Sequence, residues 1–308
     1  MVGLSVLKEV ETLERQLVPL VGKKGGDFST RHKYLQLVRK HRLRRSELVL
    51  RYGLEMLNNG KDRSRLGDDL WNVYEQVGVA ALDCGDLDAC KACYMELAKR
   101  FPVSVRVRRL EGLICEAKGF WSKADRLYDE LMELAPGNQQ LYKRKISIMK
   151  AQGNLAEAVE MLNTYLFLFM GDMEAWRELA DVYTTLQMYK QAAFCFEELV
   201  LSDPQNPLFH LGYADLLYTM GGVENYRTAK SYYCAVVELT KGKNVRALYG
   251  ICLCAVAISS SKGGRPKEIG EAFSLASGVL AKEYKALCPA KESLVTSVFR
   301  KQADSFSG

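Results

Sequence analysis

Residues 173–206 read MEAWRELADVYTTLQMYKQAAFCFEELVLSDPQN, and this stretch decides the fold. Its apolar and small residues recur at spacings of three and four, as expected for helices that each bury one face. They form two groups, the first made of Trp176, Leu179, Ala180 and Tyr183 and the second of Ala192, Phe196 and Leu199. Pro204 follows the second group and prevents a helix from continuing. The stretch therefore predicts two amphipathic helices joined by a short turn.

The same arrangement recurs upstream at a constant interval of 34 residues. Small residues stand at this interval, and together with Ala192 they form a column of four members: Cys90, Ala124, Ala158 and Ala192. Four residues after each member of the column stands a large apolar residue, namely Tyr94, Tyr128, Leu162 and Phe196. Five residues before each member stand Gly85, Gly119, Gly153 and Gln187. Four units in register indicate a repeat architecture.

Each column has a physical role in a pair of antiparallel helices. A small residue is needed where the two helices cross closely, because a larger side chain would overpack the crossing. A glycine ends the first helix and permits the left-handed backbone of a short turn. We therefore expect one set of residues to pack the repeats together: Cys90, Ala124, Ala158, Ala192, Trp176, Tyr183, Phe196 and Pro204.

The eight residues that recur in 173–206 occupy the signature positions of the tetratricopeptide repeat, a helix–turn–helix unit of this length. The predicted fold is all-α: a tetratricopeptide-repeat superhelix, or α-solenoid, of about five to seven helix pairs. Such an array buries its apolar faces between neighbouring pairs and presents extended surfaces to partners. The expected function is therefore one of binding.

The register divides the chain into a central array and two ends. Five repeats are expected at 71–104, 105–138, 139–172, 173–206 and 207–243. In the fifth, Ala229 follows Ala192 by 37 residues, and we assign the three extra residues to an enlarged turn at 221–225. Upstream, residues 1–30 are expected to be a mobile N-terminal arm and 31–70 to be capping helices. Residues 244–308 are expected to hold a degenerate repeat and a C-terminal cap.

Composition limits the classes of protein that remain. The 308 residues carry a formal net charge of +6, which is too mild for a dedicated nucleic-acid binder. The nine cysteines are odd in number and irregularly spaced, and charged residues interrupt the first twenty residues where a secretory signal would stand. We expect reduced thiols in a cytosolic protein. The chain has no uncharged apolar run long enough to span a bilayer.

Few residues offer chemistry. Cys90 and Cys93 form a C-x-x-C pair, which in isolation is compatible with a redox or zinc site. The repeat places Cys90 in the packing column, however, and no second cysteine pair lies at zinc-finger distance. The three histidines, His32, His41 and His210, lack metal-ligand spacing. We predict that the protein is not an enzyme and binds no cofactor, and we keep a redox or metal enzyme built on the C-x-x-C pair as an alternative.

Two sets of charged residues are candidate contact surfaces. Residues 31–45 contain seven Lys or Arg residues and no acid, and the core of this candidate basic patch is Arg39, Lys40, Arg42, Arg44 and Arg45. This stretch fits a solvated helix face, an acidic partner or anionic lipid headgroups. The first helices of the repeats give a candidate partner-binding groove of mixed charge: Arg109, Lys143, Arg144, Arg177, Glu178 and Asp181.

One common use of this fold is the gripping of chaperone C-terminal carboxylates by paired lysine and asparagine residues of adjacent first helices. The corresponding positions are Glu75 and Val79, Arg109 and Leu113, Lys143 and Ser147, Arg177 and Asp181, and Leu211 and Asp215. None of these pairs supplies the lysine and asparagine donors. The residues therefore argue against a carboxylate clamp.

Several stretches go beyond the general repeat pattern. They are LGDDLW at 66–71, YEQV at 74–77, RKI at 144–146, KAQG at 150–153, EAW at 174–176, AAFC at 192–195 and YTMGGVEN at 218–225. Together they resemble the family of subunit 2 of the endoplasmic reticulum (ER) membrane protein complex, over roughly residues 45–255.

The resemblance implies a concrete function. Members of that family are non-catalytic cytosolic scaffolds of a complex whose embedded subunits insert transmembrane segments, tail-anchored and multipass, into the ER membrane. The implied partners are cytosolic segments of the integral subunits and a peripheral cytosolic subunit, at the cytoplasmic face of the ER, with possible contact with the membrane surface and no nucleic acid. The alternative is a generic tetratricopeptide adaptor or co-chaperone that binds peptides in its concave groove.

Overall fold

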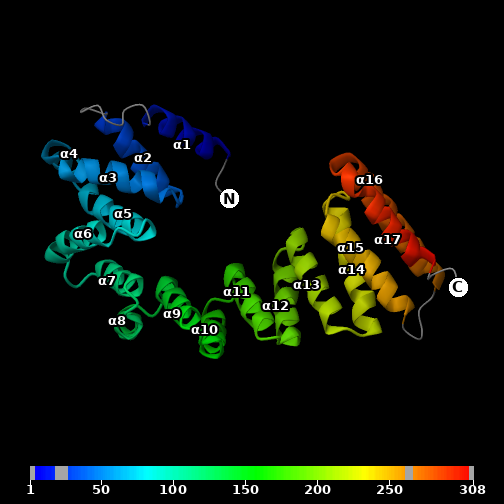
Figure 1. The fold of residues 1–308 in the computed structure, drawn as a ribbon. Helices are drawn as coiled ribbons and strands as arrows, with labels where there is room; N and C mark the ends of the chain where they lie inside the picture. The colour runs from blue at the N-terminus through cyan, green and yellow to red at the C-terminus, as the bar shows by residue number, and fades with distance from the viewer. Residues whose placement is uncertain (1–3, 18–26, 261–265, 305–308) are drawn as a thin grey trace. The chain divides into compact units, whose positions relative to one another are not determined.

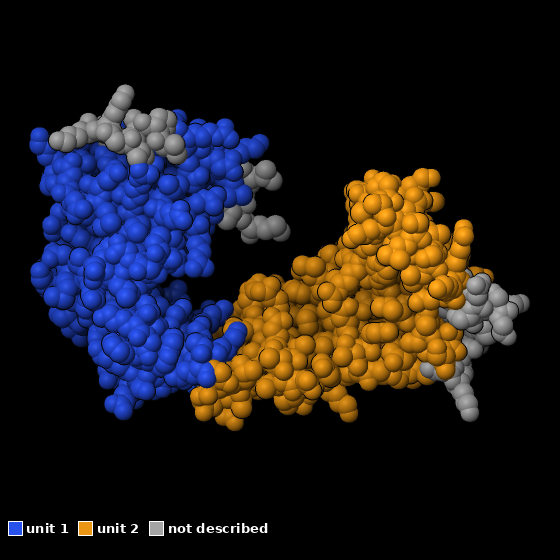
Figure 2. Space-filling view, in the orientation of Figure 1, with its two compact units in different colours: residues 1–152 blue, residues 153–308 orange. Residues whose placement is uncertain are grey.

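The computed structural model describes residues 4–17, 27–260 and 266–304, and these ranges contain helices, turns and no strand (Figure 1). The chain divides into two compact units, residues 1–152 and residues 153–308 (Figure 2). The boundary falls inside the expected repeat 139–172, between its two helices. The all-helical fold predicted from the sequence is confirmed.

Unit 1 consists of α1 to α9. Their bounds are α1 Leu4–Leu17, α2 Phe28–Lys40, α3 Ser46–Asn58, α4 Gly60–Arg65, α5 Asp69–Asp83, α6 Leu87–Arg100, α7 Val105–Ala117, α8 Trp121–Leu134 and α9 Gln139–Ala151. The helices α5 and α6 form one antiparallel pair and α7 and α8 form the next (Figure 1). The apolar core of α1 to α7 runs continuously from Val10 to Ile114.

Unit 2 consists of α10 to α17. Their bounds are α10 Leu155–Leu168, α11 Met173–Thr185, α12 Tyr189–Ser202, α13 Pro207–Met220, α14 Val223–Leu239, α15 Val245–Ser259, α16 Pro266–Leu287 and α17 Glu292–Asp304. The pairs α11/α12, α13/α14 and α15/α16 follow one another, and each helix packs on the next. The four short connections that join consecutive helices from α11 to α15 force these helices to run antiparallel.

The turns inside the pairs have the backbone that the sequence predicts. Gly85, Gly119 and Gly153 have φ angles of +78°, +73° and +80°. Gln187 takes the same place in the fourth repeat with a φ of +59°, although it carries a Cβ atom. Left-handed backbone at a non-glycine residue costs on the order of 1 kcal/mol, which the surrounding helix packing must offset.

The starts of the first helices carry a capping signal that lies outside the columns described above. Asn138, Asp172 and Asn206 stand 34 residues apart, and each accepts a hydrogen bond from a backbone N–H in the first turn of α9, α11 or α13. Asn244 does the same for α15. Such caps stabilise a helix by about 1 kcal/mol, so each repeat fixes the start of its own first helix.

The prediction of an enlarged turn in the fifth repeat is wrong. Only Gly221 and Gly222 separate α13 from α14, and their φ angles of +74° and +94° reverse the chain within two residues. The extra residues lengthen α14 at its start instead, so that Ala229 is the seventh residue of α14 whereas Ala192 is the fourth of α12. Consecutive glycines make this possible because neither carries a Cβ atom that would oppose positive φ.

The two ends of the chain also differ from expectation. Residues 4–17, expected to be part of a mobile arm, form α1, which buries Val10, Leu13 and Leu17 against the rest of unit 1. The glycine-rich stretch that follows α1 lies outside the described residues. At the other end, where a C-terminal cap is expected, α17 buries Phe299, while Leu294 and Val298 are 64% and 44% exposed.

Candidate partner-binding surfaces

The small-residue column is buried, as expected for residues at close helix crossings. Cys90, Ala124, Ala158 and Ala192 each belong to the second helix of a pair, and none has any exposed surface. Trp176, Tyr183 and Phe196 are only half-buried, and Pro204 is exposed. The large members of the expected packing set therefore reach the surface, where they are available to a partner.

Unit 1 contains a hollow of about 670 Å³ that gathers cationic side chains. Its walls come from the end of α2, the segment 41–45, the start of α3, one face of α5, one position on α7 and two on α9. Six arginines line it: Arg39, Arg42, Arg44, Arg45, Arg109 and Arg144. We call this hollow the arginine cavity. It joins four members of the expected basic patch to two members of the expected groove.

The segment between α2 and α3 positions three of these arginines, Arg42, Arg44 and Arg45. The helix α2 ends at Lys40, and Arg42 then adopts a φ of +50°, which turns the chain before α3 begins at Ser46. Because the segment has no acidic residue, its side chains find their partners on other helices. Lys40 is exposed and does not line the cavity.

Asp83 at the end of α5 holds one edge of the arginine cavity. Both its carboxylate oxygens accept hydrogen bonds from Arg44, at 2.9 and 3.3 Å, and one of them also accepts from the Ser46 hydroxyl. Burial alone would raise the pKa of Asp83, but the hydrogen bonds from Ser46 and Arg44 outweigh it and hold the pKa below its usual value. The carboxylate is therefore charged at neutral pH and ties α3 to α5.

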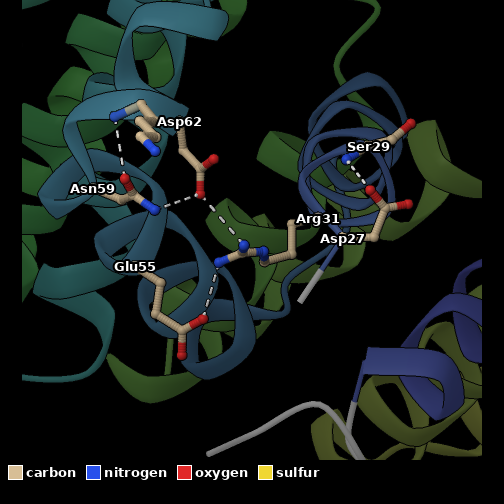
Figure 3. A network of polar contacts seen from close by, with 7 residues as sticks. Asp27, Ser29, Arg31, Glu55, Asn59 and Asp62 are labelled. Carbon is tan, nitrogen blue, oxygen red and sulfur yellow. Dashed lines mark hydrogen bonds and ion pairs between the residues drawn. The ribbon is translucent and has the colours of Figure 1, made fainter. Parts of the chain in front are cut away.

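Three other cations of the stretch 31–45 also contact side chains of unit 1. Arg39 donates to Asn72 at 2.8 Å, and Arg45 lies 3.1 Å from Glu14 on α1. Arg31 is buried between Glu55 and Asp62, at 3.2 and 3.4 Å (Figure 3). The acid-free stretch is therefore matched by acids brought in from α1, α3, α4 and α5, which favours a structural use for most of its charge.

Arg109 and Arg144 close the opposite wall of the arginine cavity. Arg109 on α7 lies 3.3 Å from Glu75 on α5, and Arg106 also pairs with that carboxylate. Arg144 on α9 makes a two-pronged contact with Glu116, which also accepts a hydrogen bond from the buried hydroxyl of Tyr128. The Tyr128 pKa is strongly raised, first by burial and then by the Glu116 charge, so this hydroxyl stays protonated.

The remaining members of the expected groove lie elsewhere. Arg177, Glu178 and Asp181 belong to α11 in unit 2, where Arg177 lies 3.1 Å from Glu174 of its own helix. Lys143 is half-buried on α9 and does not line the arginine cavity. The six residues therefore fall on two separate units.

A second hollow, of about 440 Å³, lies on unit 2 between α10, α11 and α12. Trp176 and Phe194 face each other there edge to face, with ring centroids 6.2 Å apart, and the indole N–H donates to the Met170 carbonyl at 2.9 Å. Phe194 is 53% exposed, and Phe167, Met170 and Leu201 on the same helices or turn are exposed as well. The sequence did not predict this apolar surface, because the helical spacing of apolar residues alone does not distinguish exposed residues from core residues.

The thiols have the opposite character from reactive cysteines. Burial raises the pKa of Cys90 to about 11 and that of Cys93, Cys195, Cys252 and Cys254 to about 12. A catalytic or redox cysteine needs a lowered pKa. Among the described residues, no group of three or more His, Cys, Asp or Glu side chains is placed to hold a metal ion.

None of the described helices is both long enough and apolar enough to span a membrane.

The fold has counterparts among solved structures. A solved structure of the C-terminal part of a tetratricopeptide repeat-containing protein from Cytophaga hutchinsonii aligns with a TM-score of 0.56, covering 91% of this chain and 99% of that one, at 16% identity. The chain is therefore a protein of the tetratricopeptide-repeat class.

Sequence comparison narrows this class. A family model described as the EMC2 TPR-like repeat domain matches residues 94–224. ER membrane protein complex subunit 2 of Xenopus tropicalis is 44% identical over 72% of this chain and 74% of its own length. The protein of that name in Dictyostelium discoideum is 36% identical over 67% of this chain and 64% of its own. The chain belongs to the family of ER membrane protein complex subunit 2.

Proposed function

We propose that this chain is a non-catalytic scaffold subunit of an ER membrane protein complex, placed on the cytosolic face of the ER. There it organises embedded subunits that insert tail-anchored and multipass segments into the membrane. The observation that carries the proposal is the 44% identity to a subunit of that name over 72% of the chain. A stack of helix pairs with large exposed surfaces is suited to holding several partners at once.

The side chains support a scaffold in preference to an enzyme. The buried thiols have raised pKa values, and burial is the first cause in each case. The charged groups around the arginine cavity pair with one another in structural contacts between helices. These are arrangements that hold helices together.

Partner binding is assigned to unit 2 in this proposal. There, the hollow of Trp176 and Phe194 is also lined by the polar side chains of Asn163, Lys190 and Gln191, and α11 carries Arg177, Glu178 and Asp181 as well. An apolar centre with a charged rim is the usual composition of a stable interface. A permanent complex should bury about 2,000 Å² or more in total, which requires contacts beyond this one hollow.

Insertion into ER membranes prepared from cells depleted of the chain tests the proposal. A tail-anchored reporter should insert poorly, and wild-type chain expressed in those cells should restore insertion. Phe194→Asp should fail to restore it, because the exposed ring would be replaced by a charge in the interface. Met95→Asp is the matched control, since Met95 is 56% exposed on α6 of the other unit. Normal insertion without the chain would refute the proposal.

The same preparation separates the scaffold from a generic co-chaperone. A co-chaperone of this fold should bind a free peptide ending in Glu-Glu-Val-Asp, and insertion should then depend on the chaperone. The clamp positions Glu75, Leu113 and Asp215 carry no donor of the required kind, so we expect no such binding.

A further inference from the structure

The arginine cavity has more positive charge than the contacts between helices use. Six arginines and two carboxylates, Glu75 and Asp83, line it, and Glu14 and Glu116 pair with two of these arginines from outside the lining, so the arginines exceed the carboxylates by two charges. All its cations are arginines. A guanidinium group presents five N–H donors in a planar fork, which matches the oxygens of phosphate better than a lysine ammonium does. The composition points to an anion with several phosphate groups.

The arginines are held in place while keeping donors for a ligand. Arg44, Arg45, Arg109 and Arg144 contact Asp83, Glu14, Glu75 and Glu116 respectively. A carboxylate engages at most two or three of the five N–H groups of its arginine, and the rest remain available. Because the carboxylates fix the guanidinium positions beforehand, a ligand loses less free energy in ordering them.

Two of the six arginines, Arg39 and Arg42, make no ion pair within the described residues, and Arg39 is held by its hydrogen bond to Asn72 instead. Arg42 is the exception. Its side chain is exposed, lines the cavity and makes no ion pair within the described part of the chain. Its backbone has a φ of +50°, a conformation that side chains with a Cβ atom rarely adopt. An unpaired cation held at the cavity by a strained turn is a direct candidate for ligand contact.

The lining favours a compact polyanion over a nucleic acid. Its apolar residues are Val38, Val49 and Ala80, which are at most 5% exposed, half-buried Leu43, and Val79, which is 37% exposed. The described lining residues include no aromatic ring on which a base could stack. The volume of about 670 Å³ lies within the range of roughly 300–1,000 Å³ that is typical of small-molecule sites.

We propose that the arginine cavity binds a multiply phosphorylated small molecule of the inositol polyphosphate class, either free or as the headgroup of a lipid. This goes beyond the scaffold function, which requires no such ligand. Bound between α2, α3, α5, α7 and α9, the ligand links five helices of unit 1. It therefore stabilises the end of the array that contains α1 to α9.

Calorimetric titration of the full chain with inositol hexakisphosphate tests the proposal. We expect saturable binding at one site at near-physiological salt, and a rise in the melting temperature of the chain. Arg42→Gln should weaken binding roughly tenfold, the change expected for one lost charged hydrogen-bonding contact. Glutamine and arginine should adopt the positive φ of this turn equally well. The melting temperature of Arg42→Gln without ligand should therefore equal that of the wild-type chain.

Arg126→Gln is the matched control, because Arg126 is exposed on α8 of the same unit and lies outside the cavity. It removes the same charge and should leave the affinity unchanged. Equal weakening by both variants would show a non-specific charge effect and overturn the proposal. Absence of saturable binding would do so as well. Tighter, Arg42-dependent binding of a poly-glutamate peptide would assign the cavity to a peptide and contradict the proposal.

Vesicle sedimentation distinguishes the two sources of the ligand. Phosphatidylcholine vesicles with and without phosphatidylinositol bisphosphate are mixed with the wild-type chain and with Arg42→Gln. Sedimentation that needs the phosphorylated lipid, is reduced by Arg42→Gln and is reversed by free inositol hexakisphosphate assigns a lipid headgroup. Binding of the free compound without sedimentation assigns a soluble ligand. Either result supports the shared chemistry.

Discussion

The ring of Tyr128 on α8 lies directly against the backbone of Gly112 on α7, so that a Cβ atom on Gly112 would be 2.6 Å from the ring. Tyr128 is fully buried and its hydroxyl donates to Glu116, so the ring has no room to withdraw. A glycine and an aromatic ring therefore set the separation of these two helices. No column of the 34-residue pattern showed this pairing.

The same relationship recurs twice in unit 2. A Cβ atom on Gly212 of α13 would lie 2.4 Å from the Phe196 ring of α12. One on Gly250 of α15 would lie 2.5 Å from the Tyr233 ring of α14. Helix spacing along the array therefore depends on these glycines as well as on the small-residue column.

Gly112→Ala should destabilise the protein by about 1–3 kcal/mol through overpacking against Tyr128, despite the better helix propensity of alanine. Denaturant unfolding measures the effect. Gly137→Ala is the control, because nothing lies within 4 Å of the position where its Cβ would be placed. Equal stability of the two variants would contradict the close approach of α7 and α8.

Ala192→Trp should destabilise unit 2 by about 1–3 kcal/mol or more, because Ala192 has no exposed surface at its helix crossing. Since neighbouring pairs support one another, hydrogen exchange should rise along α11, α12 and α13 together. Leu201→Trp on the same helix α12, at a position that is 74% exposed, should leave exchange unchanged. Identical exchange in the two variants would show that the repeat register is wrong.

The stability of unit 1 should depend on pH through Asp83. Its pKa in the folded protein lies below the usual value, so its contribution is fully present above the unfolded pKa of about 4 and is lost as the pH falls through the folded pKa. Arg44 is 82% exposed, so we expect a contribution of no more than about 1 kcal/mol.

Urea unfolding of the wild-type protein and Asp83→Asn at neutral and acid pH checks this. The difference in unfolding free energy between them should be largest at neutral pH and should shrink as Asp83 becomes protonated. High salt should reduce it too. A difference that grows toward acid pH would mean that the carboxylate is not held in its charged form.

Thiol alkylation at neutral pH should separate exposed from buried cysteines. Cys84 is exposed and should react first, whereas Cys90 and Cys93 are buried with pKa values raised to about 11 and about 12. The latter two should react only when the protein is unfolded. Mass spectrometry of the labelled peptides gives the order. Rapid labelling of Cys93 in the folded protein would restore the redox alternative.

The sequence predicts the regular repeats of this fold better than the places where the repeat pattern is interrupted. The 34-residue interval is visible because each repeat needs a small residue at its crossing and a left-handed residue in its turn, as at Ala124 and Gly119. The interval fails at Gly221 and Gly222, where an insertion can lengthen either a turn or a helix. Spacing alone does not distinguish the two outcomes.

The charged surfaces were less predictable. The stretch 31–45 lacks acids, but Glu14 and Asp83, which neutralise Arg45 and Arg44, lie roughly 30 to 40 residues away in the sequence. Only the packing of α1 and α5 on the segment between α2 and α3 brings them together. The apolar surface at Phe194 was missed for a similar reason, since a repeat pattern does not say which apolar residues stay exposed.

The most direct test of the scaffold claim is isolation of the tagged full chain from detergent-solubilised membranes of its own cells, with identification and quantification of what accompanies it. The account predicts stoichiometric recovery of several integral membrane proteins, which persists at high salt and is reduced by Phe194→Asp but not by Met95→Asp. Recovery of the chain as a free monomer, without integral membrane proteins, would contradict it.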